Sequence, residues 1–125
     1  MIKGIGIDVV HVHRMERWVK IPGLLERYFH PEELSAAMAR KNGATLSLAA
    51  RFAAKEAFGK ALGTGLAGIV LKDIVVINRH NGQPEIQVYG TALAAAKNMG
   101  AEYIHLSLTH EKDNAVAMVV LESNS

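Results

Sequence analysis

The strongest structural signal in this chain is the stretch TLSLAARFAAKEAFGKAL, which spans Thr45 to Leu62. It is rich in alanine and leucine, contains no proline and is followed by glycine, so it predicts a helix. Residues spaced three and four apart along it form a mostly small, apolar stripe that also carries Glu56 and Lys60. A carboxylate on such a face is costly unless a cation, a salt bridge or a metal ion meets it. Glu56 therefore needs a partner.

An apolar strand is predicted at the start of the chain. Residues Ile2–Val10 alternate glycine with isoleucine and then run apolar, which indicates a buried strand that ends near Asp8. Its glycines permit close approach of another backbone or a ligand. A short helix is expected over His11–Val19, and a further helix should begin at Pro31 and end at Gly43.

The second half of the chain predicts two hairpins and a helix. The expected elements are strands at Asp73–Arg79 and Glu85–Tyr89, a helix at Thr91–Met99, and strands at Tyr103–His110 and Ala115–Glu122. The first two strands are joined through Asn81-Gly82, a strong hairpin signal. This order predicts an α+β fold in which a largely antiparallel sheet packs with the long central helix, as a single domain over residues 1–125.

The composition excludes several kinds of function. The 125 residues include no cysteine, which excludes a disulfide, a thiolate nucleophile and a zinc–cysteine site. Asp8 interrupts the first apolar run, which argues against a cleavable signal, and no segment approaches the ~20 apolar residues that span a bilayer. We therefore expect a soluble, intracellular protein. The net charge is only +2, aromatic residues are few and no dense basic run exists, so nucleic-acid binding is not expected.

Asp8, Glu56 and Lys60 are the candidates for chemistry, and each has a simpler explanation. Mg²⁺ typically takes one or two protein carboxylates together with substrate phosphate oxygens, and a lysine one helical turn after Glu56 supplies positive charge for phosphate. Asp8 could instead cap the following helix. Glu56 and Lys60 could form an ordinary i,i+4 salt bridge worth about 0.3–0.5 kcal/mol. Taken one by one, these simpler roles are favoured.

Five ordered blocks of sequence extend through almost the whole chain. They are Gly4–Asp8 with Arg14 beyond it, Arg51–Gly65, Leu71–Ile74, Gly82–Pro84 and His105–His110. Together they resemble the holo-acyl-carrier-protein synthases, the small homotrimeric 4'-phosphopantetheinyl transferases. The chain departs from that pattern at Val70 and Leu71, where the family often has a serine and a tryptophan. The resemblance implies the 4'-phosphopantetheinyl transferase fold.

The resemblance also implies an activity. It is the transfer of 4'-phosphopantetheine from coenzyme A to a serine of apo acyl carrier protein, with release of adenosine 3',5'-bisphosphate, in support of fatty acid biosynthesis. The metal-binding carboxylates of the family fall on Asp8 and Glu56, which would hold Mg²⁺ against the pyrophosphate. Lys60 would face the phosphates and stabilise charge on the leaving group. The base that deprotonates the serine could be Glu56 or a metal-bound water.

The binding residues are carried over in the same way. Arg51, Lys60, Thr109 and His110 are expected to bind the coenzyme, and Arg14 is expected to contact the acidic recognition helix of the carrier protein. Arg51 could equally lie with Lys55 on a solvated outer face of the helix, the usual fate of such charges. The resemblance implies a cytoplasmic homotrimer whose coenzyme contacts cross the subunit interface.

Two other classes of function compete with the enzyme. One is a non-catalytic module that binds a carrier protein or a nucleotide, although pure binding would not obviously require a metal pair. The other is an oligomeric interaction protein whose alanine-rich helices form subunit contacts, which leaves Glu56 without a partner. The range of carrier proteins, the use of acyl-coenzyme A and the choice between Mn²⁺ and Mg²⁺ depend on side-chain placement.

Overall fold

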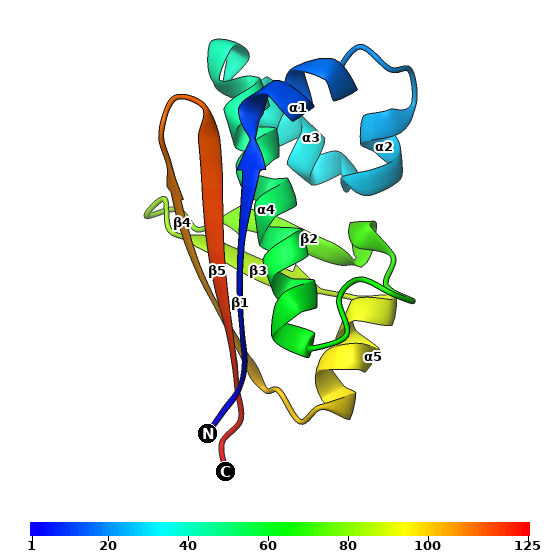
Figure 1. The fold of residues 1–125 in the computed structure, drawn as a ribbon, viewed down its shortest axis with the longest axis vertical. Coiled ribbons are helices and arrows are strands. Elements are labelled where there is room, and N and C mark those ends of the chain that lie inside the picture. Colours follow the sequence, from blue (N-terminus) through cyan, green and yellow to red (C-terminus); the bar gives the residue numbers. More distant parts are fainter.

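The computed structural model describes all residues from 1 to 125 and has the expected α+β architecture (Figure 1). Its elements are β1 (Ile2–His11), α1 (Val12–Trp18), α2 (Leu24–Tyr28), α3 (Pro31–Met38), α4 (Ala44–Leu62), β2 (Ile74–Asn78), β3 (Pro84–Val88), α5 (Gly90–Asn98), β4 (Tyr103–His110) and β5 (Asn114–Glu122). Short 3₁₀ turns at Lys41–Gly43 and Leu71–Asp73 precede α4 and β2. No helix is long and apolar enough to cross a membrane.

All strand pairs are antiparallel, as the sequence predicts. Strands β1, β5 and β4 form a three-stranded sheet in that order, and β2 and β3 form a separate hairpin. Helix α4 packs along the sheet, while α1, α2 and α3 gather at one end of the molecule and α5 lies at the other (Figure 1). All the buried apolar residues except Val75 form one contiguous cluster, in which α4 packs against the strands and the other helices.

Two glycines of β1 allow α4 to pack directly on the strand. A Cβ atom at Gly4 would lie 1.9 Å from the carbonyl oxygen of Ala61, and one at Gly6 would lie 2.0 Å from that of Ala57. No side chain larger than hydrogen fits at either position. The sequence predicts that either another backbone or a ligand approaches these glycines, and the structure shows that it is the backbone of α4.

The other face of β1 is exposed, which corrects the expectation of a buried strand. Ile5, Ile7 and Val9 are each more than half exposed, and Met118 of β5 is 42% exposed. Successive strand residues point to opposite faces, so the glycines and Asp8 face α4 while the isoleucines face outward. No other element of the chain covers this outer face of the sheet, which is unusually apolar for a surface.

The remaining differences from the expected elements are local. Helix α2 was not predicted, because the Ile21-Pro22-Gly23 break leaves only five residues for it. Helix α3 begins at Pro31 as predicted but ends at Met38, before the 3₁₀ turn. Its start is held by a capping box in which the His30 imidazole accepts from the Glu32 N–H and the Glu33 carboxylate accepts from the His30 N–H.

Candidate functional site

Lys60 and Asp8 form an ion pair between α4 and β1. The Lys60 Nζ atom lies 2.8 Å from Asp8 Oδ1 and also donates to the Ile7 carbonyl at 3.2 Å. The Asp8 side chain is largely covered, with 16% exposed, whereas Lys60 is 55% exposed. The hydrogen bond to the Asp8 carboxylate raises the pKa of Lys60, with further support from the charges of Asp8 and Glu56. Lys60 therefore stays fully cationic at neutral pH.

Glu56 lies one helical turn before Lys60, yet the two form no ion pair, because the Lys60 ammonium bonds to Asp8. Burial raises the pKa of Glu56, and the neighbouring Asp8 raises it further, while Arg14 and Lys60 act in the opposite direction. Asp8 is thus close enough to Glu56 for the two carboxylates to interact. The i,i+4 salt bridge offered as a simpler explanation is therefore wrong.

The capping role offered for Asp8 is also wrong. The N-cap of α1 is His11, and no side chain caps that helix end. Asp8 instead lies on the face of β1 that packs against α4. The capping role fails because β1 continues beyond Asp8 to His11, and the helical salt bridge fails because Lys60 bonds to Asp8 across the contact of β1 with α4.

Arg14 lies beside this cluster. Its guanidinium carbon is 4.9 Å from the ring centroids of both Trp18 and Phe52, which places it in cation–π contact with each ring. Arg14 is half-buried and close enough to Glu56 to lower the pKa of that carboxyl. The structure thus brings together four of the predicted residues, Asp8, Arg14, Glu56 and Lys60.

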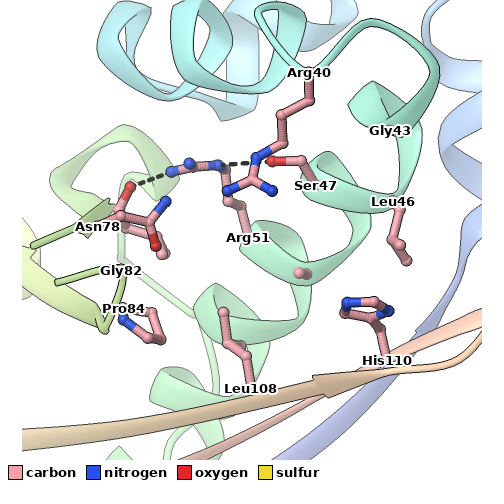
Figure 2. A pocket seen from close by; sticks show the side chains of 12 residues that line it. Arg40, Gly43, Leu46, Ser47, Arg51, Asn78, Gly82, Pro84, Leu108 and His110 are labelled. Atoms are coloured by element: carbon pink, nitrogen blue, oxygen red, sulfur yellow. Dashed lines mark hydrogen bonds between the residues drawn. The ribbon is translucent and has the colours of Figure 1, made fainter. Parts of the chain in front are cut away.

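A separate pocket of about 220 Å³ lies at the other end of α4 (Figure 2). It is lined by residues before and within the first half of α4, from the β2–β3 hairpin and from the end of β4, namely Arg40, Gly43, Leu46, Ser47, Ala50, Arg51, Val76, Asn78, Gly82, Pro84, Leu108 and His110. Figure 2 shows the side chains of Arg40 and Arg51 on one side and that of His110 on another. The lining carries basic groups and no carboxylate, so it suits an anionic ligand.

Arg51 and Lys55 are both buried, with 3% and 0% exposed, which corrects the alternative of a solvated helix face. Arg51 Nη1 donates to the Val76 carbonyl, and Arg51 Nε donates to Ser47 Oγ at 3.3 Å. Burial lowers the pKa of Arg51, while the nearby Glu33 carboxylate partly opposes this shift. A guanidinium nevertheless remains charged at any physiological pH. Arg51 can thus present its remaining N–H donors to an anion in the pocket.

The predicted residues therefore divide into two groups. Arg51 and Glu56 are five positions apart on α4, which corresponds to a rotation of about 140° around the helix axis. Arg51 and His110 belong to the pocket, and Glu56 belongs to the cluster with Asp8. Thr109 belongs to neither, because it is exposed and alternates along β4 with the pocket residues Leu108 and His110. It lies on the outer face of the sheet.

Sequence reasoning missed Arg40, Ser47 and Asn78 as pocket residues. None of them stands in a pattern that predicts binding, since they come from a helix end, a helix and a strand end that only the fold brings together. It also missed Glu33, a fully buried acid at the start of α3. A capping-box acid is usually exposed, so its position in sequence gives no signal of burial.

The two carboxylates meet the minimum requirement of one kind of metal centre. No group of three or more histidine, aspartate or glutamate side chains converges anywhere in the chain, so a complete all-protein metal cage is absent. Mg²⁺ commonly binds through only one or two carboxylates and takes its other ligands from substrate and water. Asp8 and Glu56, two nearby acids from separate elements, fit that mode of binding.

The chain is similar to known proteins over almost its whole length. Residues 4–119 match the model of the 4'-phosphopantetheinyl transferase superfamily. The holo-(acyl-carrier-protein) synthase of Treponema denticola is 58% identical over 122 residues, which cover 98% of this chain and 99% of the relative. The synthase of Treponema pallidum is 46% identical over 122 residues, covering 98% and 97%.

Solved structures show the same fold. A holo-(acyl-carrier-protein) synthase from Bacillus anthracis in complex with CoA (3',5'-ADP) superposes with a TM-score of 0.83 at 37% identity and covers 99% of both chains. The Helicobacter pylori synthase in complex with coenzyme A has a TM-score of 0.78 at 28% identity, covering 94% of this chain and 99% of that one.

Proposed function

This chain belongs to the 4'-phosphopantetheinyl transferase superfamily, and we propose that Asp8, Glu56 and Lys60 form its reaction centre. As a holo-acyl-carrier-protein synthase, the enzyme transfers 4'-phosphopantetheine from coenzyme A to a serine of apo acyl carrier protein, in support of fatty acid biosynthesis. Residues 1–125 are proposed to act as one domain, which agrees with their single core. The observation that carries the assignment of the centre is the convergence of two carboxylates and one ammonium group from β1 and α4.

Asp8 and Glu56 would hold Mg²⁺ in this proposal. The Glu56 side chain forms no ion pair, and burial and the adjacent Asp8 raise its pKa more than the charges of Arg14 and Lys60 lower it. A divalent cation between the two carboxylates would satisfy both of them. When bound, Mg²⁺ supplies positive charge that neutralises the pyrophosphate. Substrate phosphate oxygens would complete the coordination, which accounts for the small number of protein ligands.

The protein groups contribute charge and a base. Lys60 keeps its proton and is largely exposed, so it can contact a phosphate oxygen and stabilise the charge that develops on the leaving adenosine 3',5'-bisphosphate. Glu56 is half-buried beside Asp8 in the same cluster, and a positioned carboxylate can act as a general base. We propose that it accepts the proton of the carrier serine as the oxygen attacks phosphorus.

The basic pocket is proposed to bind an anionic part of coenzyme A. Arg51 and His110, both predicted, line it together with Arg40. A fixed guanidinium binds phosphate oxygens well because its N–H donors match their geometry. Thr109 faces away from this pocket, so it would contact the coenzyme only from the outer face of the sheet.

The outer face of the three-stranded sheet is proposed to be the subunit interface of a homotrimer. Ile5, Ile7, Val9 and Met118 expose a row of apolar side chains there, and burial of such a row is the usual source of association energy. Thr109 lies on the same face. Assembly through this face would bring Thr109 against a neighbouring subunit, as a coenzyme site shared between subunits requires.

Arg14 is proposed to bind the acidic helix of the carrier protein. Its guanidinium rests on Trp18 and Phe52 and is only half-buried, so it is held in place yet accessible. Its position beside Glu56 would bring the carrier serine near the reaction centre. A cytoplasmic location is part of the same proposal and is tested by cell fractionation.

A mass-shift assay tests the reaction. Purified protein is incubated with coenzyme A, Mg²⁺ and an apo carrier protein of fatty acid synthesis, and the mass of the carrier protein is measured by mass spectrometry. The carrier should gain one phosphopantetheine group, and omission of Mg²⁺ with added chelator should abolish the gain. An unmodified carrier that nevertheless binds the protein would favour the non-catalytic module instead.

A further inference from the structure

Glu33 and Lys55 form an ion pair in the centre of the molecule, apart from the reaction centre. Lys55 Nζ lies 2.7 Å from Glu33 Oε1, and neither side chain has any exposed surface. Burial lowers the pKa of Lys55, while the charge and hydrogen bond of Glu33 oppose this shift. A buried pair of this kind seldom stabilises a fold more than apolar residues of the same volume would. The role of the Glu33–Lys55 pair therefore lies in how it positions the groups to which it is hydrogen-bonded.

All three donors of Lys55 and both carboxylate oxygens of Glu33 form hydrogen bonds. The three donors of Lys55 go to Glu33, to the Leu71 carbonyl at 2.9 Å and to the Ile74 carbonyl. Glu33 Oε1 also accepts from the His30 N–H at 3.0 Å, and Oε2 accepts from the Val76 N–H at 3.1 Å. The pair thereby links α3, α4 and β2.

These bonds cover the free edge of β2. Strand β2 pairs only with β3, so the backbone groups along its other edge have no strand partner. Three charged side chains take that place: Lys55 binds the Ile74 carbonyl, Glu33 binds the Val76 N–H, and Arg51 binds the Val76 carbonyl. Buried backbone groups need such partners, so the three side chains determine where this edge lies.

Val76 connects the pair to the pocket. Its N–H is held by Glu33 and its carbonyl by Arg51, and both Val76 and Arg51 line the pocket. Lys55 follows Arg51 by one helical turn and holds the same strand two residues earlier. Displacement of the β2 edge would therefore move the carbonyl that orients the Arg51 guanidinium.

We propose that Glu33 and Lys55 are positioning residues for Arg51: by fixing the free edge of β2 they aim its guanidinium into the pocket. This inference rests on the coenzyme-binding role proposed for the pocket. Neither residue touches the coenzyme, and their effect reaches it through Val76 and Arg51. Loss of the pair should consequently weaken coenzyme binding and leave the reaction centre of Asp8 and Glu56 intact.

The first test compares Glu33→Gln with Glu32→Gln. Glutamine has one acceptor oxygen, so it cannot serve both Lys55 and Val76. Glu32 is exposed one position earlier, and its side chain makes no hydrogen bond to β2. Coenzyme A binding is measured by calorimetry, and KM and kcat with saturating carrier protein. Glu33→Gln should raise Kd and KM for coenzyme A about tenfold and leave kcat within about twofold, while Glu32→Gln behaves as wild type. A fall in kcat with unchanged KM would overturn the positioning role.

A double-mutant cycle with Arg51→Met identifies the route. If Glu33 acts through Arg51, Glu33→Gln should add no further loss of coenzyme affinity to Arg51→Met. Independent, additive losses would overturn the inference. If Glu33→Gln binds coenzyme A like the wild type while Arg51→Met binds it more weakly, the positioning role of Glu33 is overturned but the role of the pocket is not. Unchanged binding by Arg51→Met overturns the proposed role of the pocket as well.

Two further variants separate positioning from general loss of stability. The double variant Glu33→Gln/Lys55→Met removes both charges and leaves no unpaired ion in the core. It replaces Glu33→Gln in the binding measurement if that single variant does not fold. It should still bind coenzyme A about tenfold more weakly, because the Ile74 carbonyl loses its donor. Leu121→Ala, a core truncation on β5, should lower the melting temperature and keep wild-type affinity. Equal weakening by Leu121→Ala would overturn the inference.

Discussion

The ammonium group of Lys60 lies 2.8 Å from the carboxylate of Asp8, across 52 positions of sequence. This contact leaves Glu56, the nearer acid in sequence, without an ion-pair partner, and burial raises the pKa of that carboxyl. Strand β1 and helix α4 therefore bring the carboxylates of Asp8 and Glu56 and the ammonium group of Lys60 together, but only Asp8 and Lys60 form an ion pair. The unpaired Glu56 is the group that a cation or a proton would most affect.

Glu56→Gln should reduce turnover by at least ~100-fold, or about 2.7 kcal/mol of transition-state stabilisation, because it removes a metal ligand and the proposed base. Stability should not fall. A carboxyl whose pKa is higher in the folded state costs stability as pH rises from its usual value of 4.5 through the raised one, and glutamine removes that cost. Steady-state kinetics and urea unfolding at pH 7 check both statements. Near-normal turnover in a folded variant would require a metal site built on other residues.

Arg14→Glu should raise KM for the carrier protein about tenfold and flatten the dependence of the rate on salt, because it reverses a charge proposed to meet an acidic helix. Coenzyme A affinity should stay at the wild-type value. Lys97→Glu on α5 makes the same change of charge at an exposed position at the other end of the molecule, and it should leave the carrier KM unaltered. Equal KM values for the two variants at low salt would remove Arg14 from the interface.

Ile7→Lys should prevent trimer assembly, because it places a charge in the apolar outer face of the sheet. Sedimentation velocity should then show a monomer, and activity should fall with assembly if the coenzyme site is shared. In the wild type, assembly and activity should decrease together on dilution. Val70→Lys alters an equally exposed apolar residue outside the sheet and should remain trimeric. A fully active wild-type monomer would contradict the proposed interface.

Gly6→Ala should destabilise the fold by about 3 kcal/mol, because the new Cβ would meet the Ala57 carbonyl oxygen at 2.0 Å. Gly43→Ala is the matched control, since a Cβ there lies 3.6 Å from its nearest neighbour in ordinary contact. Chemical denaturation of both variants measures the difference. Equal stabilities would mean that β1 and α4 are not in direct backbone contact.

Glu33→Gln should destabilise the protein by about 3–5 kcal/mol at pH 7, because it leaves the Lys55 ammonium buried without its counter-charge. Its stability should then increase with pH. Burial holds the pKa of folded Lys55 below the usual 10.5, so the unfolded chain binds more protons between those two values, and deprotonation favours folding. Urea unfolding at a series of pH values from 7 up to the usual pKa of 10.5 tests the slope. A flat or falling stability would place Lys55 in contact with solvent.

Local sequence was sufficient for most of the elements, α2 excepted, and for the identity of the chemical groups. Alanine and leucine between Thr45 and Leu62 favour a helix in any context, and Asn81-Gly82 favours a tight turn, so α4 and the β2–β3 hairpin were predicted close to their observed bounds. The pairing of Asp8 and Glu56 came from resemblance to a family, because each acid alone was better explained as a cap or a helical salt bridge.

Burial and partnership were decided only by the tertiary structure. Lys55 and Glu56 are adjacent in sequence, yet Lys55 is fully enclosed and bound to Glu33, whereas Glu56 is only half-buried and interacts with the charge of Asp8. Ile7 is an apolar residue in an apolar stretch of sequence, which predicts burial, yet it lies on the exposed outer face of the three-stranded sheet. The physical reason is that charge and hydrophobicity belong to the residue, whereas desolvation and pairing depend on which elements pack around it.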